Sequence, residues 1–299
     1  MEFLHKNREQ FLEAINLAEH QTGIMAQIIE KDYYVTMILK LLAGKVSYIV
    51  FKGGTSLSKC HKAIKRFSED IDITVDTILS QGEKKKLKYI IVDVVEKLGL
   101  QIINLEETRS RRDYNKYVIV YDTVLPTLSE ALQPEVLIET SYMAISFPTV
   151  VLPISSYIGE MMVSEAPDMI QTYALEPFKM KVQGIDRTLI DKIFAVCDYF
   201  LNDFIRKHSR HIYDIYKLLP LVEMDDRFKN LAAEVREIRK NSPNCSSAQD
   251  GVNIPETLQT IIEREIYKPD YHEITEKLLE EQVSYKVAIE ALKEVAERW

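Results

Sequence analysis

The pattern of apolar and polar positions predicts mixed helices and strands in the first part of the chain. Apolar side chains recur at helical spacing over residues 1–43, where Gly23 and Gly44 end two predicted helices. The amphipathic run 83–98 predicts a third helix. Short apolar or alternating runs predict strands at residues 48–51, 68–75, 100–105, 117–121 and 135–141.

From residue 186 onward the pattern is helical. Residues 147–170 are rich in proline and serine and predict a short strand and a loop. Helices are predicted at residues 188–196, 210–219, 225–240, 256–266 and 272–299. We therefore expect an α+β protein, with an α/β domain over residues 1–170 and a helical domain over residues 171–299.

Residues 47–76 predict a strand, a glycine turn, a helix and a second strand. Gly53 and Gly54 permit positive φ and allow another group to approach the backbone closely. Thr55 or Ser56 is suited to cap the helix that follows, which we expect to run to about residue 64. The free N–H groups at such a helix start suit a phosphate, although a pair of glycines also occurs in ordinary turns.

Two aspartates follow on the second strand of this stretch. The alternation over residues 68–75 places Ser68, Asp70 and Asp72 on one face. Because like charges held close together destabilise a strand, folding alone gives no reason for this pair. A divalent cation such as Mg²⁺ would remove the repulsion, since it takes oxygen ligands. A phosphate cradle followed by paired carboxylates indicates phosphoryl or nucleotidyl transfer, whereas a bare D-x-D alone is common.

Three further ionisable residues lie in apolar surroundings. Glu139 lies in the otherwise apolar predicted strand, either as an edge-strand residue or as a third metal ligand beside Asp70 and Asp72. Lys192 and Asp214 lie within apolar predicted helices, where a buried charge is costly without a partner. One interpretation is a structural ion pair between two helices. The other is a functional role, in which Lys192 contacts a triphosphate.

Composition narrows the class of protein. The chain has 46% hydrophobic and 28% charged residues, typical of a soluble globular protein, and no apolar run approaches the length of a membrane span. Three scattered cysteines fit a reducing cytoplasm. The net charge of −8 argues against indiscriminate nucleic-acid binding, but a local basic surface is compatible with RNA. Basic clusters occur at residues 59–66, 84–88, 109–116 and 206–211, and each is otherwise a solvated face.

Four motifs resemble the AbiEii/AbiGii toxin family. They are FKGGTSLSK at 51–59, RFSEDID at 66–72, TLIDK at 188–192 and RHIYDIY at 210–216. The resemblance covers residues 25–220 in order. It implies a nucleotidyltransferase-like fold of the DNA polymerase β type, with a mixed sheet flanked by helices and followed by a helical domain.

The resemblance also implies a function. Members are toxins of toxin–antitoxin or phage-defence systems, and a cognate antitoxin limits their activity. Some members transfer nucleotides from NTP to the 3′ end of tRNA. Matched by position, the family's active-site residues are Ser68, Asp70, Asp72, Lys192 and Asp214, and Glu139 lies where the wider superfamily has a third carboxylate.

These observations give a working hypothesis for the site. Asp70 and Asp72, with or without Glu139, hold one or two Mg²⁺ ions against the phosphates of an NTP. Lys59 and Lys192 neutralise triphosphate charge. The predicted nucleotide-binding residues are Gly53, Gly54, Thr55, Ser56, Lys59 and Arg66, of which Arg66 contributes directly or pairs with Glu69.

Other readings compete with this hypothesis. The acceptor is a tRNA or other RNA, or it is a protein or a small molecule, which needs only a compact pocket. A module that binds a nucleotide or an antitoxin without catalysis is a second class, and the intact acidic set argues against it. A structural protein with a coincidental D-x-D is the third. We expect no membrane association.

Overall fold

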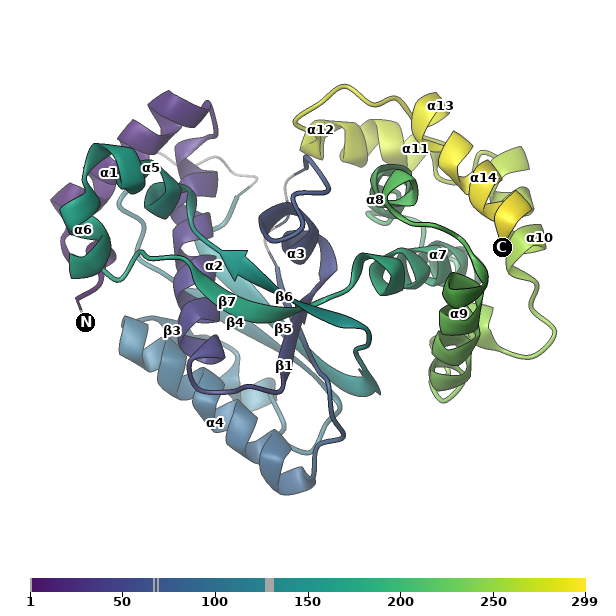
Figure 1. Cartoon of the computed structure of the whole chain (residues 1–299), viewed down its shortest axis with the longest axis horizontal. Coiled ribbons are helices and arrows are strands. Elements are labelled where there is room, and N and C mark those ends of the chain that lie inside the picture. The colour runs from purple at the N-terminus through teal and green to yellow at the C-terminus, as the bar shows by residue number, and fades with distance from the viewer. Residues whose placement is uncertain (1, 67, 69, 127–131) are drawn as a thin grey trace. The chain divides into compact units, whose positions relative to one another are not determined.

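The computed structural model describes residues 2–66, 68, 70–126 and 132–299, apart from the side chains of residues 143 and 144. The chain divides into two compact units, each of which makes most of its contacts within itself (Figure 1). The first consists of Met1–Thr55 and Glu69–Val182, and the second of Ser56–Ser68 and Gln183–Trp299. The predicted boundary between two domains at residue 170 stays a prediction.

One mixed sheet forms the centre of the first unit. Its strands in the described chain are β1 (Ile49–Lys52), β2 (Ile71–Val75), β3 (Gln101–Ile102), β4 (Tyr114–Val120), β5 (Glu135–Ile145), β6 (Thr149–Ile154) and β7 (Phe178–Gln183). Their order across the sheet is β3-β4-β5-β2-β1-β7-β6. Strand β2 runs antiparallel to β1 and parallel to β5, so the predicted mixed sheet is confirmed.

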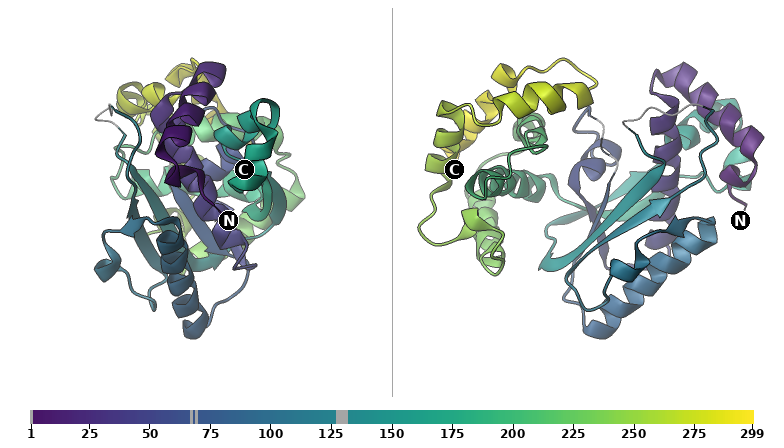
Figure 2. Two further views of the ribbon diagram at one scale, coloured as in Figure 1. Left: turned by 90° about the vertical axis from the view of Figure 1, so that its left-hand side faces the viewer. Right: turned by 180° about the vertical axis from the view of Figure 1, so that it is seen from behind.

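Helices flank this sheet. They are α1 (Arg8–Thr22), α2 (Ala26–Ala43), α4 (Gln81–Leu98), α5 (Tyr157–Glu165) and α6 (Pro167–Thr172). Helices α2 and α4 pack against each other beside the sheet (Figures 1 and 2). Ser80 and Glu83 form a capping box at the start of α4, and Gly99 ends it with a positive φ of 70°. The predicted helices over 1–43 and 83–98 are thus confirmed.

The structure corrects the region after β6. The predicted loop up to residue 170 is wrong, because α5 and α6 lie there. The Ser156 side chain caps α5 by accepting from the Gly159 N–H, and Pro167 begins α6, where a missing N–H costs nothing. Strand β7 was not predicted from the sequence.

The second unit is helical. It contains α7 (Ile185–Leu201), α8 (Arg210–Leu218), α9 (Asp226–Arg239), α10 (Ile254–Glu263), α11 (Lys268–Asp270), α12 (Glu276–Leu278), α13 (Tyr285–Ala288) and α14 (Glu290–Arg298). This confirms the helical pattern after residue 186. The predicted single helix over 272–299 is wrong, because extended backbone at Leu279 ends α12.

A short helix crosses from one unit to the other. Helix α3 (Gly53–Lys59) begins in the first unit and ends in the second. It stops before residue 64, where the sequence placed its end, and Lys62 beyond it adopts a left-handed φ of 52°, which a continuing helix does not allow. Ala63 and Ile64 then join Leu57 in the apolar core of the second unit.

Candidate functional site

Strand pairing in the first unit brings the predicted carboxylates together. In the parallel pairing of β2 with β5, Asp72 is the register partner of Glu139. On its other side Asp72 is the register partner of Lys52 in β1. Asp72 and Glu139 therefore lie on one partly exposed sheet face, and Asp70 lies immediately before β2.

Two residues of β4, Tyr114 and Lys116, lie beside the Glu139 carboxylate. The Tyr114 hydroxyl interacts with the Glu139 carboxylate, and burial together with the charges of Glu139, Asp72 and Asp70 raises the pKa of Tyr114. The Lys116 ammonium lies 3.9 Å from the Glu139 carboxylate. Sequence reasoning missed Tyr114 because it ended the loop at residue 116, although Tyr114 and Lys116 have strand spacing.

The donor set suits a hard cation that retains other ligands. Within the part of the chain that the structure describes, no three His, Cys, Asp or Glu side chains are grouped closely enough to hold a metal by themselves. Mg²⁺ is commonly held by one or two carboxylates, with waters and substrate phosphates completing its shell. Asp70 and Asp72 fit this role, and Glu139 lies beside them.

Gly53 makes room for the Asp72 carboxylate. Its φ is +78°, and a Cβ added to it would overlap the Asp72 carboxylate. The glycine is therefore required both by the backbone conformation and by the close approach of a candidate metal ligand.

We expect Gly53→Ala to lower the free energy of unfolding by about 1–3 kcal/mol and transfer activity at least about tenfold, because the methyl group must displace Asp72. Urea unfolding and a transfer assay measure the two effects. Gly23→Ala is a matched control, since Gly23 has a φ of +71° and nothing within 4 Å of an added Cβ. Equal activity of the two variants would contradict the assignment.

The second unit holds a buried group of charged side chains. Arg66 donates two hydrogen bonds to Asp214, from Nε to Oδ1 at 2.6 Å and from Nη2 to Oδ2 at 2.9 Å. The Lys192 ammonium lies 2.8 Å from the same Oδ2 and 3.2 Å from His211 Nδ1. The Arg66 and Asp214 side chains are 1% and 0% exposed. One fully buried carboxylate thus binds two cations.

Burial and charge set the ionisation of this group. Burial alone would raise the pKa of Asp214, but Arg66 and Lys192 hold it well below its usual range. Burial lowers the pKa of Lys192 against the opposing effect of Asp214. Burial, together with the Lys192 charge, lowers the pKa of His211 to about 3, so His211 is neutral at ordinary pH.

The structure thus shows which of the predicted site residues in the second unit contact one another. Lys192 on α7 and Asp214 on α8 form the helix-to-helix pair that their apolar surroundings indicated. Arg66 contacts Asp214, whereas its predicted alternative partner, Glu69, lies outside the described residues. Sequence reasoning placed His211 only in the basic cluster at 206–211 and missed its contact with this pair, although it stands three residues before Asp214 on the same helix face.

The remaining predicted nucleotide-binding residues lie in or near α3. Thr55, Ser56 and Lys59 are 4%, 0% and 8% exposed. Gly54 is buried as well, and Ser68 is partly exposed. These assignments stay predictions.

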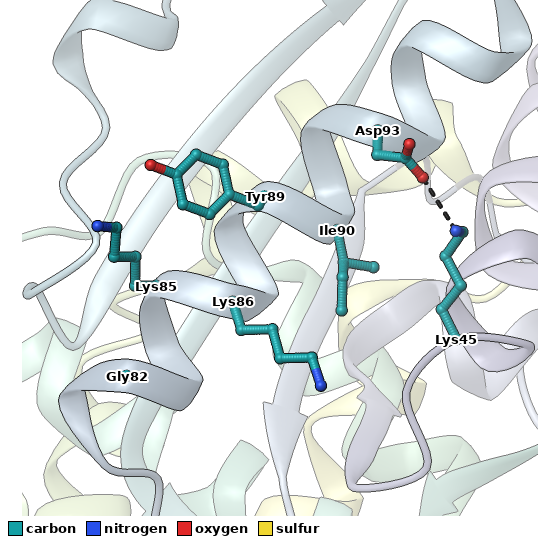
Figure 3. A pocket seen from close by; sticks show the side chains of 7 residues that line it. All are labelled: Lys45, Gly82, Lys85, Lys86, Tyr89, Ile90 and Asp93. Atoms are coloured by element: carbon teal, nitrogen blue, oxygen red, sulfur yellow. Dashed lines mark ion pairs between the residues drawn. The ribbon is translucent and has the colours of Figure 1, made fainter.

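In the predicted basic cluster at residues 84–88, two of the lysines bind other residues of the protein. On α4, Lys84 pairs with Asp113 at 2.6 Å, and Lys88 donates to the Thr108 carbonyl at 2.9 Å. Lys85 and Lys86 instead are exposed, and Lys85 lies beside the 60% exposed ring of Tyr89, whereas Lys86 points away from it (Figure 3). The Lys85 ammonium lies 5.7 Å from the Tyr89 ring centre. We call Lys85, Lys86 and Tyr89 the α4 basic surface.

No helix among the described residues is both long enough and apolar enough to cross a membrane. No curated protein matches the sequence. Among solved structures, the chain is similar to MenT4, a nucleotidyltransferase toxin from Mycobacterium tuberculosis, with 16% identity and a TM-score of 0.59. The match covers 95% of this chain and 88% of MenT4, and it confirms the nucleotidyltransferase-like α+β fold.

The sequence also matches a family over most of its length. Residues 40–298 fit the family described as "Nucleotidyl transferase AbiEii toxin, Type IV TA system". The motifs around Gly53, Asp70, Lys192 and Asp214 all fall within this range. The chain therefore belongs to the AbiEii nucleotidyltransferase toxins of type IV toxin–antitoxin systems.

Proposed function

We propose that this nucleotidyltransferase transfers nucleotides from an NTP to an RNA acceptor, such as the 3′ end of a tRNA, with Mg²⁺ as its metal. The observation that carries the proposal is the acidic surface of the first unit, where Asp72 is in register with Glu139 and packs against Gly53. Lys52 and Lys116 flank this pair across the sheet, but Asp72 and Glu139 still stand side by side as like charges, an arrangement that a metal-bound triphosphate needs.

Asp70 and Asp72 hold the metal, and Glu139 is the candidate third carboxylate. Bound Mg²⁺ supplies charge neutralisation at the phosphates and lowers the pKa of the attacking hydroxyl. The Tyr114 hydroxyl and the Lys116 ammonium restrain Glu139. For Ser68, Lys192 and Asp214 we retain the active-site roles that the family motifs imply.

The nucleotide is held by residues around α3. We retain as its ligands Gly53, Gly54, Thr55, Ser56 and Lys59. The predicted role of Arg66 is an indirect one, because its guanidinium is buried and donates to Asp214. The support for this assignment is the positive φ of Gly53 and its closeness to Asp72.

The α4 basic surface supports RNA as the acceptor. Two exposed ammonium groups suit phosphates, and an exposed tyrosine ring suits an unpaired base (Figure 3). The proposal also includes a cognate antitoxin as partner and the cytoplasm as location, where NTP and tRNA are found.

A transfer assay tests the proposal. Purified protein is incubated with Mg²⁺, total bacterial tRNA and each α-³²P-NTP in turn, beside an Asp70→Ala/Asp72→Ala variant. We expect label in tRNA with the unaltered protein only, and loss of label when EDTA is added. Label in a protein band would overturn the RNA acceptor and keep the chemistry. Growth arrest by the double variant, with no label moved by either protein, would overturn the enzymatic mechanism.

A further inference from the structure

A short backbone segment in the second unit is fixed on two sides. The Lys65 N–H donates to the Tyr213 hydroxyl at 3.0 Å. The Lys65 carbonyl accepts from the Glu280 N–H at 3.0 Å, and Arg66 forms an antiparallel bridge with Leu279. The segment that carries Arg66 is therefore attached to α8 and to the extended chain after α12.

Glu281 ties these two attachments to each other. The buried Tyr213 hydroxyl donates to Glu281 Oε1 at 2.7 Å, and Lys217 on α8 donates to the same oxygen at 2.8 Å. Partial burial opposes ionisation of Glu281, but Lys217 and Tyr213 hold its pKa below the usual value. The carboxylate is thus charged and bound to α8 at neutral pH. We call Tyr213 and residues 279–281 the C-terminal clamp.

The clamp acts next to the buried charged group. Arg66 directly follows the clamped residue Lys65, and Asp214 directly follows Tyr213. The two-bond fork between Arg66 and Asp214 is sensitive to position, because both bonds require the guanidinium and carboxylate planes to align. A shift of residues 65–66 would therefore move the Asp214 carboxylate, and with it the ammonium of Lys192, which lies 2.8 Å away.

We propose that the C-terminal clamp is a positioning device for the transfer reaction, in which Tyr213 and Glu281 hold Arg66 so that Asp214 and Lys192 take their working geometry. This gives residues 279–281 a role that their sequence does not reveal. The inference rests on the proposed function through the active-site roles of Lys192 and Asp214.

Tyr213→Phe tests the clamp, because it removes only the hydroxyl that joins Lys65 to Glu281. We expect kcat to fall roughly 10- to 100-fold, with the KM for NTP within about threefold of the original value. Tyr267→Phe is the matched control. It removes another buried tyrosine hydroxyl of the same unit, one that donates to the Val196 carbonyl at 2.7 Å and has no hydrogen bond to residues 65–66.

A second pair of variants separates positioning from folding. Glu281 is 27% exposed, so its replacement is expected to leave a folded protein. Glu281→Gln keeps an oxygen that accepts from Tyr213, whereas Glu281→Ala does not. We therefore expect Glu281→Ala to lower kcat about as much as Tyr213→Phe, and Glu281→Gln to retain most of it. Equal losses in the Gln and Ala variants would overturn the proposed role of Glu281.

Amide hydrogen exchange tests the clamp without any knowledge of the molecule that receives the nucleotide. In Tyr213→Phe the amides of Lys65 and Glu280 should exchange at least about tenfold faster, with the β2 amides unchanged. Unchanged exchange, or faster exchange with an unchanged kcat, would overturn the clamp. If the unaltered protein labels no RNA, the proposed acceptor fails, and the clamp is then decided by exchange together with growth arrest on induction.

Discussion

Replacing either Asp70 or Asp72 by asparagine is expected to lower nucleotidyl transfer by roughly 10³-fold or more, with the fold retained. Asparagine keeps the shape of the side chain but removes the negative charge that a divalent cation needs. Asp72 lies beside Glu139 across the β2–β5 pairing and beside Lys52 across the β1–β2 pairing, so the loss of its charge relieves one repulsion and removes one attraction. We therefore expect the midpoint of thermal unfolding to change little.

The measurement is the initial rate of label transfer at saturating Mg²⁺, together with thermal unfolding of each variant. Asp113→Asn is a suitable control, because Asp113 directly precedes β4 and is 51% exposed, paired with Lys84. It should retain nearly full activity. If Asp72→Asn kept more than about a tenth of the original rate, its assignment as a metal ligand would be wrong.

Asp214→Asn should lower the free energy of unfolding by about 3–5 kcal/mol. Asp214 is fully buried and binds both Arg66 and Lys192, so the change leaves two cations close together without their shared counter-charge. Chemical denaturation by urea at pH 7 measures the loss. Asp225→Asn is the control for an exposed pair of the same unit, since its partner Arg227 is 88% exposed and asparagine still caps α9.

The pH dependence of the difference in unfolding free energy between the original protein and Asp214→Asn supplies a second check. Arg66 and Lys192 hold the pKa of Asp214 well below its unfolded value of 3.8, although burial opposes them. The unfolded chain therefore takes up a proton before the folded chain does as the pH falls, and the stabilisation by this carboxylate is lost below about pH 4. The gap in stability between the original protein and Asp214→Asn should be constant at neutral pH and narrow in acid. A gap that does not change down to pH 3 would contradict the ion-pair explanation.

Local sequence determined much of this protein. The spacing of Asp70 and Asp72, the turn at Gly53 and the helices over 1–43 and 83–98 follow from strand alternation, glycine conformation and apolar periodicity. Apolar surroundings also singled out Lys192 and Asp214, because a charge in such a helix needs a partner. These features depend on neighbours within a few residues, which are visible in the sequence.

Tertiary structure alone decided which distant residues meet. Asp72 faces Glu139 because β2 pairs in parallel with β5, and a shift of the register by one residue would turn Glu139 to the other face. The partner of Arg66 lies 148 residues away, and Leu279 and Glu280 bind the same segment from the far end of the chain. No local pattern encodes such pairings, because they are selected by the packing of whole strands and helices.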